Sequence, residues 1–155
     1  MKKVFLFICV FCVISFNLNA ETIRITSGEK NAKITIIAYE SLTCKHCADF
    51  HKDIYPKLKK DYIDTGLAKI EFRHFPLDVA AFNAAKITQC KSDQGLEILE
   101  SLYLNQQAWV KGNTVEDINS NLKEYLKIKG FKIDFEKCIE NKLIEDFVLN
   151  DRIEG

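Results

Sequence analysis

Residues 33–51 read KITIIAYESLTCKHCADFH and contain the two patterns that decide the fold. Residues 33–40 are rich in β-branched side chains and almost wholly apolar in the middle, which is typical of a central strand buried on both faces. After Thr43, apolar side chains recur every three or four residues, which predicts a helix with Thr43 as its N-cap. The segment Cys44-Lys45-His46-Cys47 is therefore expected at the junction of a strand and a helix.

A Cys-x-x-Cys pair at the start of a helix is suited to disulfide chemistry. The free amides and the macrodipole of a helix N-terminus favour negative charge, so we expect Cys44 to be the nucleophilic thiolate. Cys47 lies one turn deeper and is expected to close the short disulfide and to resolve mixed disulfides. A protonated His46 adds positive charge beside Cys44, which stabilises the reduced state and makes the disulfide more oxidising.

The sequence on both sides of this segment predicts a small mixed sheet. Residues 22–26 alternate and are expected to form a short strand. Pro56 should kink the helix that follows the cysteines, and Gly66 should end it. Residues 67–75 alternate and predict a strand that Pro76 stops. A strand, a helix and a strand in succession imply a parallel pair with a right-handed crossover.

The remainder of the chain is predicted to be helical. Helices are expected at residues 78–91 and 93–110. Thr114 should open a third helix with Asp117 as its capping-box partner, and Gly130 should close it. Asp134 is expected to cap a last helix, whose apolar face would be Phe135, Ile139, Leu143 and Phe147.

The first twenty residues have the layout of a secretory signal peptide. Lys2 and Lys3 precede an apolar run over residues 4–16, and Ala20 offers a cleavage site. An uncleaved membrane anchor is the alternative, although the run is short for a bilayer span. Without this leader the chain keeps 20 basic and 22 acidic residues, a net charge of −2. We expect a location in a bacterial periplasm, where disulfides persist.

Length and charge narrow the class of protein further. The 155 residues fit one globular domain, and 22 basic residues balance 22 acidic ones. Because nucleic-acid binders need a basic excess, no nucleic-acid partner is expected.

Two further cysteines, Cys90 and Cys138, fall in predicted helices. If Cys44 pairs with Cys47, these two remain for a second, structural disulfide. That bond would enclose 47 residues and stabilise the fold by about 4 kcal/mol. Two buried free thiols are the alternative.

A metal site is a second interpretation of the same segment. Cys47 and His51 are spaced i, i+4 and could bind zinc or copper together with Cys44. An oxidising compartment and the helix-start position favour a disulfide instead. The side chains of His51 and His74 are expected to be exposed or at the edge of the core. Glu71 and Arg73 are expected to form a solvated strand face. Tyr103 and Trp109 are expected to lie in the core.

Three stretches resemble one known family. Residues 39–51 (YESLTCKHCADFH), residues 72–78 (FRHFPLD) and the helix at 81–90 are similar to segments of bacterial thiol:disulfide interchange proteins of the DsbA type. The resemblance implies an α/β thioredoxin-like domain over residues 21–155, with a helical insertion at about 78–150. It also implies an oxidase without a cofactor, which passes its disulfide to exported proteins with free thiols and is reoxidised by a membrane partner. A dimerisation domain is not expected, so a monomer is favoured. The sequence does not distinguish an oxidase from an isomerase.

The chain departs from this family at two active-site positions. Lys45 stands where the family often has proline, and its charge should still favour the thiolate. Ala38 stands where the family often has a buried acid. Because side chains two residues apart share a strand face, we expect Glu40 to take over proton transfer to and from Cys47.

A third departure concerns the end of the fold. The family has a cis-proline loop that faces the cysteines, followed by two strands and a helix, but the only prolines here are Pro56 and Pro76. We therefore expect a thioredoxin-like fold whose C-terminal strands are missing, with an exposed sheet edge. The alternative to an active oxidoreductase is then an inactive truncated remnant of the family.

Overall fold

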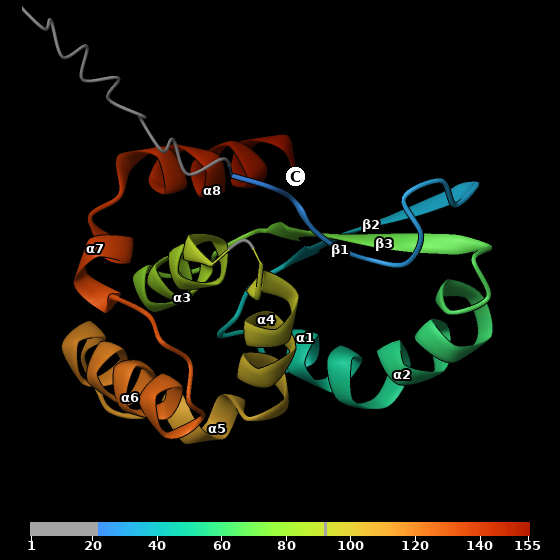
Figure 1. Cartoon of the computed structure of the whole chain (residues 1–155). Coiled ribbons are helices and arrows are strands. Elements are labelled where there is room, and N and C mark those ends of the chain that lie inside the picture. The colour runs from blue at the N-terminus through green and yellow to red at the C-terminus, as the bar shows by residue number, and fades with distance from the viewer. Residues whose placement is uncertain (1–21, 92) are drawn as a thin grey trace, which may run out of the picture.

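The computed structural model describes residues 22–91 and 93–155. The predicted signal peptide at residues 1–20 lies outside the described residues. Three strands form one sheet, namely β1 (Ile25–Ser27), β2 (Ile34–Glu40) and β3 (Ala68–His74), in the order β1-β3-β2 (Figure 1). β2 runs parallel to β3 and β1 runs antiparallel to it, so the predicted parallel pair is confirmed.

The central strand is β3 and not β2. Along β3 the side chains of Ala68, Ile70, Phe72 and His74 are buried, which matches the predicted alternation. β2 lies at the sheet edge, and its outer edge pairs with no other strand in the described part of the chain. Ile34 and Ile37 are about half exposed. The expectation that β2 is buried on both faces was therefore wrong, because strand composition does not fix strand order.

The helix after β2 is interrupted as Pro56 predicts. It consists of α1 (Lys45–Asp49), a π-helical turn at Phe50–Ile54, α2 (Tyr55–Leu58) and a second π-helical turn at Lys59–Ile63. Pro56 lies in the first turn of α2, where its missing N–H disturbs the regular hydrogen bonding. Gly66 follows with a φ of 76°, in the left-handed region that suits a residue without a Cβ.

The N-cap of α1 is Cys44 and not Thr43. The hydroxyl of Thr43 instead donates a hydrogen bond to the carboxylate of Asp78 at 2.6 Å. Asp78 is itself the N-cap of the next helix and accepts from the backbone N–H of Ala81. The loop before the cysteines is thus tied to the start of the helical part of the molecule.

In the described part of the chain, six helices follow β3. They are α3 (Val79–Cys90), α4 (Gly95–Leu104), α5 (Gln106–Trp109), α6 (Val115–Ile128), α7 (Phe135–Ile139) and α8 (Lys142–Glu154). The capping box of Thr114 and Asp117 is confirmed at the start of α6. Two predicted helices are each split in two. The helix at 93–110 breaks at Asn105, and the last helix breaks before Asn141, whose side chain caps α8.

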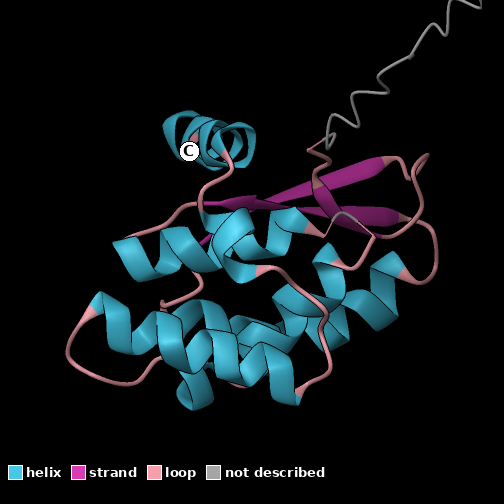
Figure 2. Ribbon diagram, turned by 60° about the vertical axis from the view of Figure 1, so that its left-hand side comes forward, coloured by secondary structure: helices cyan, strands magenta, loops and turns pink. Residues whose placement is uncertain are grey.

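The sheet lies between α8 on one side and the helices that begin at Cys44 on the other (Figures 1 and 2). α3 packs against α4, α6, α7 and α8 and so lies at the centre of the helical part. Tyr103 and Trp109 are buried, as predicted, and the indole of Trp109 donates to the carbonyl of Leu102 at 3.0 Å. The other large, fully buried side chains include Phe72, Ile87, Ile98, Leu122, Ile144 and Val148.

Charged side chains hold α8 against the sheet. Arg24 forms ion pairs with Asp151 and with Glu71, and Arg73 bridges Glu71 and Glu154 at 2.7 and 2.5 Å. Only about 15% of the side-chain surface of Glu71 and Arg73 is exposed. The prediction of a solvated strand face was therefore wrong, because α8 returns from a distant part of the sequence to cover these residues.

No helix within residues 22–91 and 93–155 combines the length and the apolar composition that a membrane crossing needs.

Candidate active site

Cys44 and Cys47 lie at the start of α1, where the sequence places them. Both thiols are free in this structure and both residues are partly exposed. The N–H of Cys44 donates to the carbonyl of Ser41 at 3.0 Å, and the carbonyl of Cys44 accepts from Ala48 at 3.2 Å. Cys44 is thus held as the N-cap of α1, at the end of the helix where backbone amides lack an intrahelical partner.

Gln106 fixes this loop from the helical part of the molecule. Its side-chain amide donates to the carbonyls of Leu42 and Cys44 at 2.9 and 3.0 Å. Gln106 is the first residue of α5, so the break at Asn105 turns the chain toward the cysteines. Gln106 was not predicted as a site residue, since nothing in its local pattern marks it as a partner of a loop 62 residues away.

The two thiols differ in their environment. Burial raises the pKa of Cys47 to about 11, and the neighbouring Cys44 and the charge of Glu40 add to this rise. A hydrogen bond from the Ser41 backbone acts in the opposite direction. Cys47 is therefore a thiol that needs a proton acceptor before it can attack a disulfide.

Lys45 and His46 point into solvent and associate with Asp49. The ammonium of Lys45 lies 2.8 Å from the Asp49 carboxylate, and this hydrogen bond raises the pKa of Lys45 and lowers that of Asp49. The imidazole of His46 is 94% exposed and its Nδ1 lies 4.0 Å from the same carboxylate. Because Asp49 partly neutralises both cations and solvent screens them, their effect on Cys44 is expected to be modest.

Glu40 belongs to a buried polar group beneath the cysteines. Its Oε2 lies 2.7 Å from Nε2 of His51, and both side chains are almost fully buried. The imidazole of His51 stacks on Tyr103, with ring centroids 4.1 Å apart and planes at 14°. Burial raises the pKa of Tyr103 well above its ordinary value, and the charges of Glu40 and Cys47 contribute.

His74 is buried as well, so the expectation that both histidines are exposed or at the core edge was wrong. His74 ends β3 opposite Glu40, and its Nε2 lies 3.0 Å from the side-chain nitrogen of Gln89. Burial lowers its pKa to about 4, with the positive charge of Arg24 adding to the effect. The polar partners of both histidines come from other elements, which is why sequence periodicity did not reveal their burial.

The metal interpretation finds no support in the described residues. They contain no group of three or more His, Cys, Asp or Glu side chains that could hold a metal ion. His51, proposed as the third ligand beside Cys44 and Cys47, instead directs its Nε2 to Glu40.

The structure joins Cys90 to Cys138 through a disulfide with a Cα–Cα distance of 5.6 Å. Cys90 ends α3 and Cys138 lies in α7, so the bond links two helices that pack against each other.

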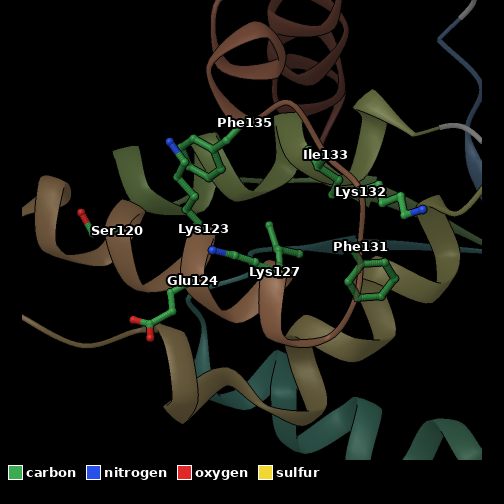
Figure 3. A pocket seen from close by; sticks show the side chains of 9 residues that line it. Ser120, Lys123, Glu124, Lys127, Phe131, Lys132, Ile133 and Phe135 are labelled. Atoms are coloured by element: carbon green, nitrogen blue, oxygen red, sulfur yellow. The ribbon is translucent and has the colours of Figure 1, made fainter.

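Two pockets differ in their relation to the cysteines. One of about 390 Å³ opens beside α1 and is lined by residues that include Lys45, Asp49, Tyr103 and Gln106. The other, of about 540 Å³, is formed by α6 and residues 131–135 (Figure 3). Its lining contains no residue of α1, whereas the lining of the first pocket includes Lys45, the neighbour of Cys44 in the sequence, so of these two pockets the first adjoins the candidate active site.

Comparisons with known proteins show the family of this chain. Residues 20–154 match a protein-family model described as Thioredoxin. The chain is 29% identical over 126 residues to a Rickettsia bellii protein with the provisional name protein-disulfide oxidoreductase, which covers 79% of this chain and 48% of that protein. It is 27% identical over 127 residues to disulfide bond formation protein D of Bacillus subtilis, which covers 71% of this chain and 57% of that protein.

The crystal structure of Wolbachia pipientis alpha-DsbA1 superposes on this chain with a TM-score of 0.75 and 34% identity. The match covers 84% of this chain and 66% of that one. The chain spans about half the length of the curated relatives it matches. The expected α/β thioredoxin-like fold with a helical insertion is confirmed by these matches. The chain belongs to the thioredoxin family, among its DsbA-like members.

Proposed function

We propose that this protein is a thiol:disulfide oxidoreductase that introduces or exchanges disulfides in exported proteins through Cys44 and Cys47. One observation carries the proposal, namely the pair of partly exposed cysteines at the start of α1, with Cys47 having the raised pKa. The names of the relatives support the same chemistry.

The reaction begins with the oxidised pair. A substrate thiolate attacks Sγ of Cys44, the Cys44–Cys47 bond breaks, and Cys47 leaves with the electron pair and takes up a proton. A second substrate thiolate then attacks the substrate sulfur of the mixed disulfide and releases Cys44 as a thiolate. The substrate loses two electrons and the protein gains them. The amides at the start of α1 stabilise the Cys44 thiolate and so favour its release.

Glu40 is proposed to carry the proton to and from Cys47. Its burial and its contribution to the raised pKa of both Cys47 and Tyr103 support this role. Replacing Glu40 by Gln keeps the size of the side chain and removes the proton acceptor. The exchange rate of Glu40→Gln should fall by about 10²-fold, and an unchanged rate would exclude the role.

Cellular location and partners complete the proposal. Residues 1–20 would direct export to a bacterial periplasm, and residues 21–155 would form the working domain with its helical insertion at about 78–150. Substrates would be exported proteins with free thiols, and a membrane partner would restore the disulfide of a monomeric protein. Labelling of Cys44 with a membrane-impermeant thiol reagent in intact spheroplasts tests the location, and lack of labelling contradicts it.

The first experiment is a titration of the protein against glutathione, in which alkylation and mass spectrometry follow Cys44 and Cys47. A reversible two-electron transition at an oxidising potential is expected. Aggregation, or behaviour like that of unstructured thiols, would instead support an inactive remnant. In the same titration His46→Ala and Lys45→Ala should each shift the equilibrium constant by about twofold toward a weaker oxidant, and no shift would remove these residues from the tuning of the site.

A further inference from the structure

Beneath the two cysteines, the side chain of His51 is 2% exposed and that of Glu40 is 8% exposed, so bulk water does not satisfy their polar atoms. His51 lies in the π-helical turn after α1, while Glu40 ends β2. The single contact between them, at 2.7 Å, joins the helix that carries Cys47 to the strand that leads into the active-site loop. A buried carboxylate needs such a partner in order to remain buried.

The second ring nitrogen of His51 decides its protonation. Nδ1 is buried and has no hydrogen-bond partner in the described part of the chain. A doubly protonated ring would leave an N–H buried without an acceptor, whereas a neutral ring with its hydrogen on Nε2 leaves only a lone pair there. Orphaned buried donors are rarer in proteins than under-satisfied acceptors. The geometry thus favours the neutral ring, with Nε2–H donating to Glu40.

Packing prevents the His51 ring from turning away. It stacks on Tyr103 at 4.1 Å, and its centroid lies 5.2 Å from that of Phe72 and 5.4 Å from that of Tyr55. Three elements therefore fix the ring plane, and the ring in turn fixes one oxygen of the Glu40 carboxylate. The Glu40 carboxylate also interacts with the hydroxyl of Tyr103, and its charge acts on Cys47.

We infer that His51 is a positioning residue, which donates its Nε2 hydrogen to Glu40 and holds that carboxylate in place as the proton acceptor of Cys47. The inference deepens the proposed function and rests on it. In the resolving step, Cys47 passes its proton to Glu40 and attacks the Cys44 mixed disulfide, so that the substrate leaves as a thiolate and the Cys44–Cys47 bond re-forms. His51 keeps its own proton throughout.

The titratable groups that face this pair come from every element around it. They are Cys44 and Cys47 at the start of α1, Tyr55 from α2, Tyr103 and Glu100 from α4, and His74 from β3. Burial raises the pKa of both tyrosines and lowers that of His74, so neither tyrosine loses a proton and His74 gains none near neutral pH.

The test uses the rate at which Cys47 resolves a glutathione mixed disulfide on Cys44, measured from about pH 5 to about pH 9. His51→Phe keeps a flat ring for stacking on Tyr103 and removes the donor. His51→Gln has a side-chain N–H that can donate to Glu40 from about the same distance along the side chain. Lys86→Met is the control for the loss of a buried polar group, since Lys86 contacts Ile139 and Glu145 instead.

In His51→Phe, Cys47 should resolve the mixed disulfide about tenfold more slowly near pH 7. The difference in rate from the unmodified protein should narrow as the pH rises, because Cys47 then loses its proton without the help of Glu40. His51→Gln should recover most of the rate, and Lys86→Met should match the unmodified protein. A His51→Phe profile equal to that of the unmodified protein overturns the inference. A loss by the same factor at every pH, with no rescue by Gln, overturns it as well, because a merely structural role would produce that result.

Nitrogen NMR of the unmodified protein gives a readout that does not depend on exchange. At pH 7 the His51 ring should be neutral with its hydrogen on Nε2, and an imidazolium or an Nδ1–H ring overturns the inference. If the unmodified protein exchanges no disulfides, the proposed function fails and the role of His51 fails with it. If exchange is normal and only His51→Phe is without effect, the inference alone fails.

Discussion

The two cysteine pairs of this chain have opposite surroundings. Only two residues separate Cys44 from Cys47. Both cysteines lie at the start of α1, and both thiols are free in this structure. Cys90 and Cys138 are 48 residues apart and are joined between α3 and α7. Both residues of the first pair are partly exposed and lie near the buried carboxylate of Glu40, whereas Cys138 of the second pair is buried in the apolar core.

This contrast shows that position decides what a pair of cysteines does. A bond between residues close in sequence restricts the unfolded chain little, so its formation and cleavage are set by the chemistry around the thiols. A bond across 48 residues restricts the unfolded chain strongly and serves stability. If this division holds, substitutions in the first pair should change disulfide exchange, and substitutions in the second pair should change stability.

Substitution within the first pair should abolish function without unfolding the protein. Cys44→Ser removes the attacking sulfur and should leave no measurable disulfide exchange with glutathione. Cys47→Ser should trap the mixed disulfide on Cys44, which mass spectrometry detects. Exchange that survives in Cys44→Ser would assign the chemistry to another thiol, and the Cys90→Ala, Cys138→Ala double variant is the matched control.

Removal of the second pair should act on stability alone. The double variant Cys90→Ala, Cys138→Ala loses the constraint on a long loop, so its free energy of unfolding should fall by about 4 kcal/mol. Denaturant titration measures this change, and the glutathione equilibrium of Cys44 should stay as it is. A double variant that keeps its stability but loses exchange would reverse the division between the two pairs.

Acid should lower the stability of the fold at His74, which lies between the two cysteine pairs. This residue is opposite Glu40 in the sheet and contacts the end of α3. Burial keeps the pKa of His74 at about 4, against an ordinary value of 6.5. Between these values the unfolded chain binds a proton that the folded protein does not, so stability falls as the pH falls. The loss attributable to His74 should reach about 3 kcal/mol from pH 6.5 to pH 4.

The measurement is the free energy of unfolding across this pH range, in the unmodified protein and in His74→Gln. The variant lacks the titrating group and should show a smaller decline on acidification. Parallel curves for the two proteins would mean that His74 does not cause the acid sensitivity.

The smallest change in stability is expected at Gln106, which connects the helical part to the loop before Cys44. Gln106→Ala removes the hydrogen bonds to the carbonyls of Leu42 and Cys44. This should lower the free energy of unfolding by about 1 to 2 kcal/mol and loosen the loop before Cys44, which faster amide hydrogen exchange at Cys44 would reveal. Unchanged hydrogen exchange there would mean that Gln106 does not hold the active-site loop.

Local patterns predicted much of this structure. The alternation of β3, the helix start at the cysteines and the capping box of Thr114 depend on neighbours in sequence, and all three are found. The breaks at Asn105 and before Asn141 were not predicted, because the apolar periodicity continues across both positions while the caps and packing that interrupt them come from the folded molecule.

The features that were missed all depend on distant partners. β2 is an edge strand because of the order of the sheet, which strand composition does not encode. Burial of His51 requires Glu40, and burial of His74 requires Gln89 from α3. The sequence thus indicated the chemistry at Cys44 and Cys47, while the polar support around them became visible only in three dimensions.

The attachment of α8 to the sheet has a consequence for the order in which these elements can come together. As the chain is synthesised, Arg24 and Arg73 emerge early, and Glu71 is the acid that both can reach. Asp151 and Glu154 emerge much later and supply the remaining negative charges. Until then a nascent chain carries an uncompensated cation over a bare sheet face, so this face of the sheet is covered only when α8 docks.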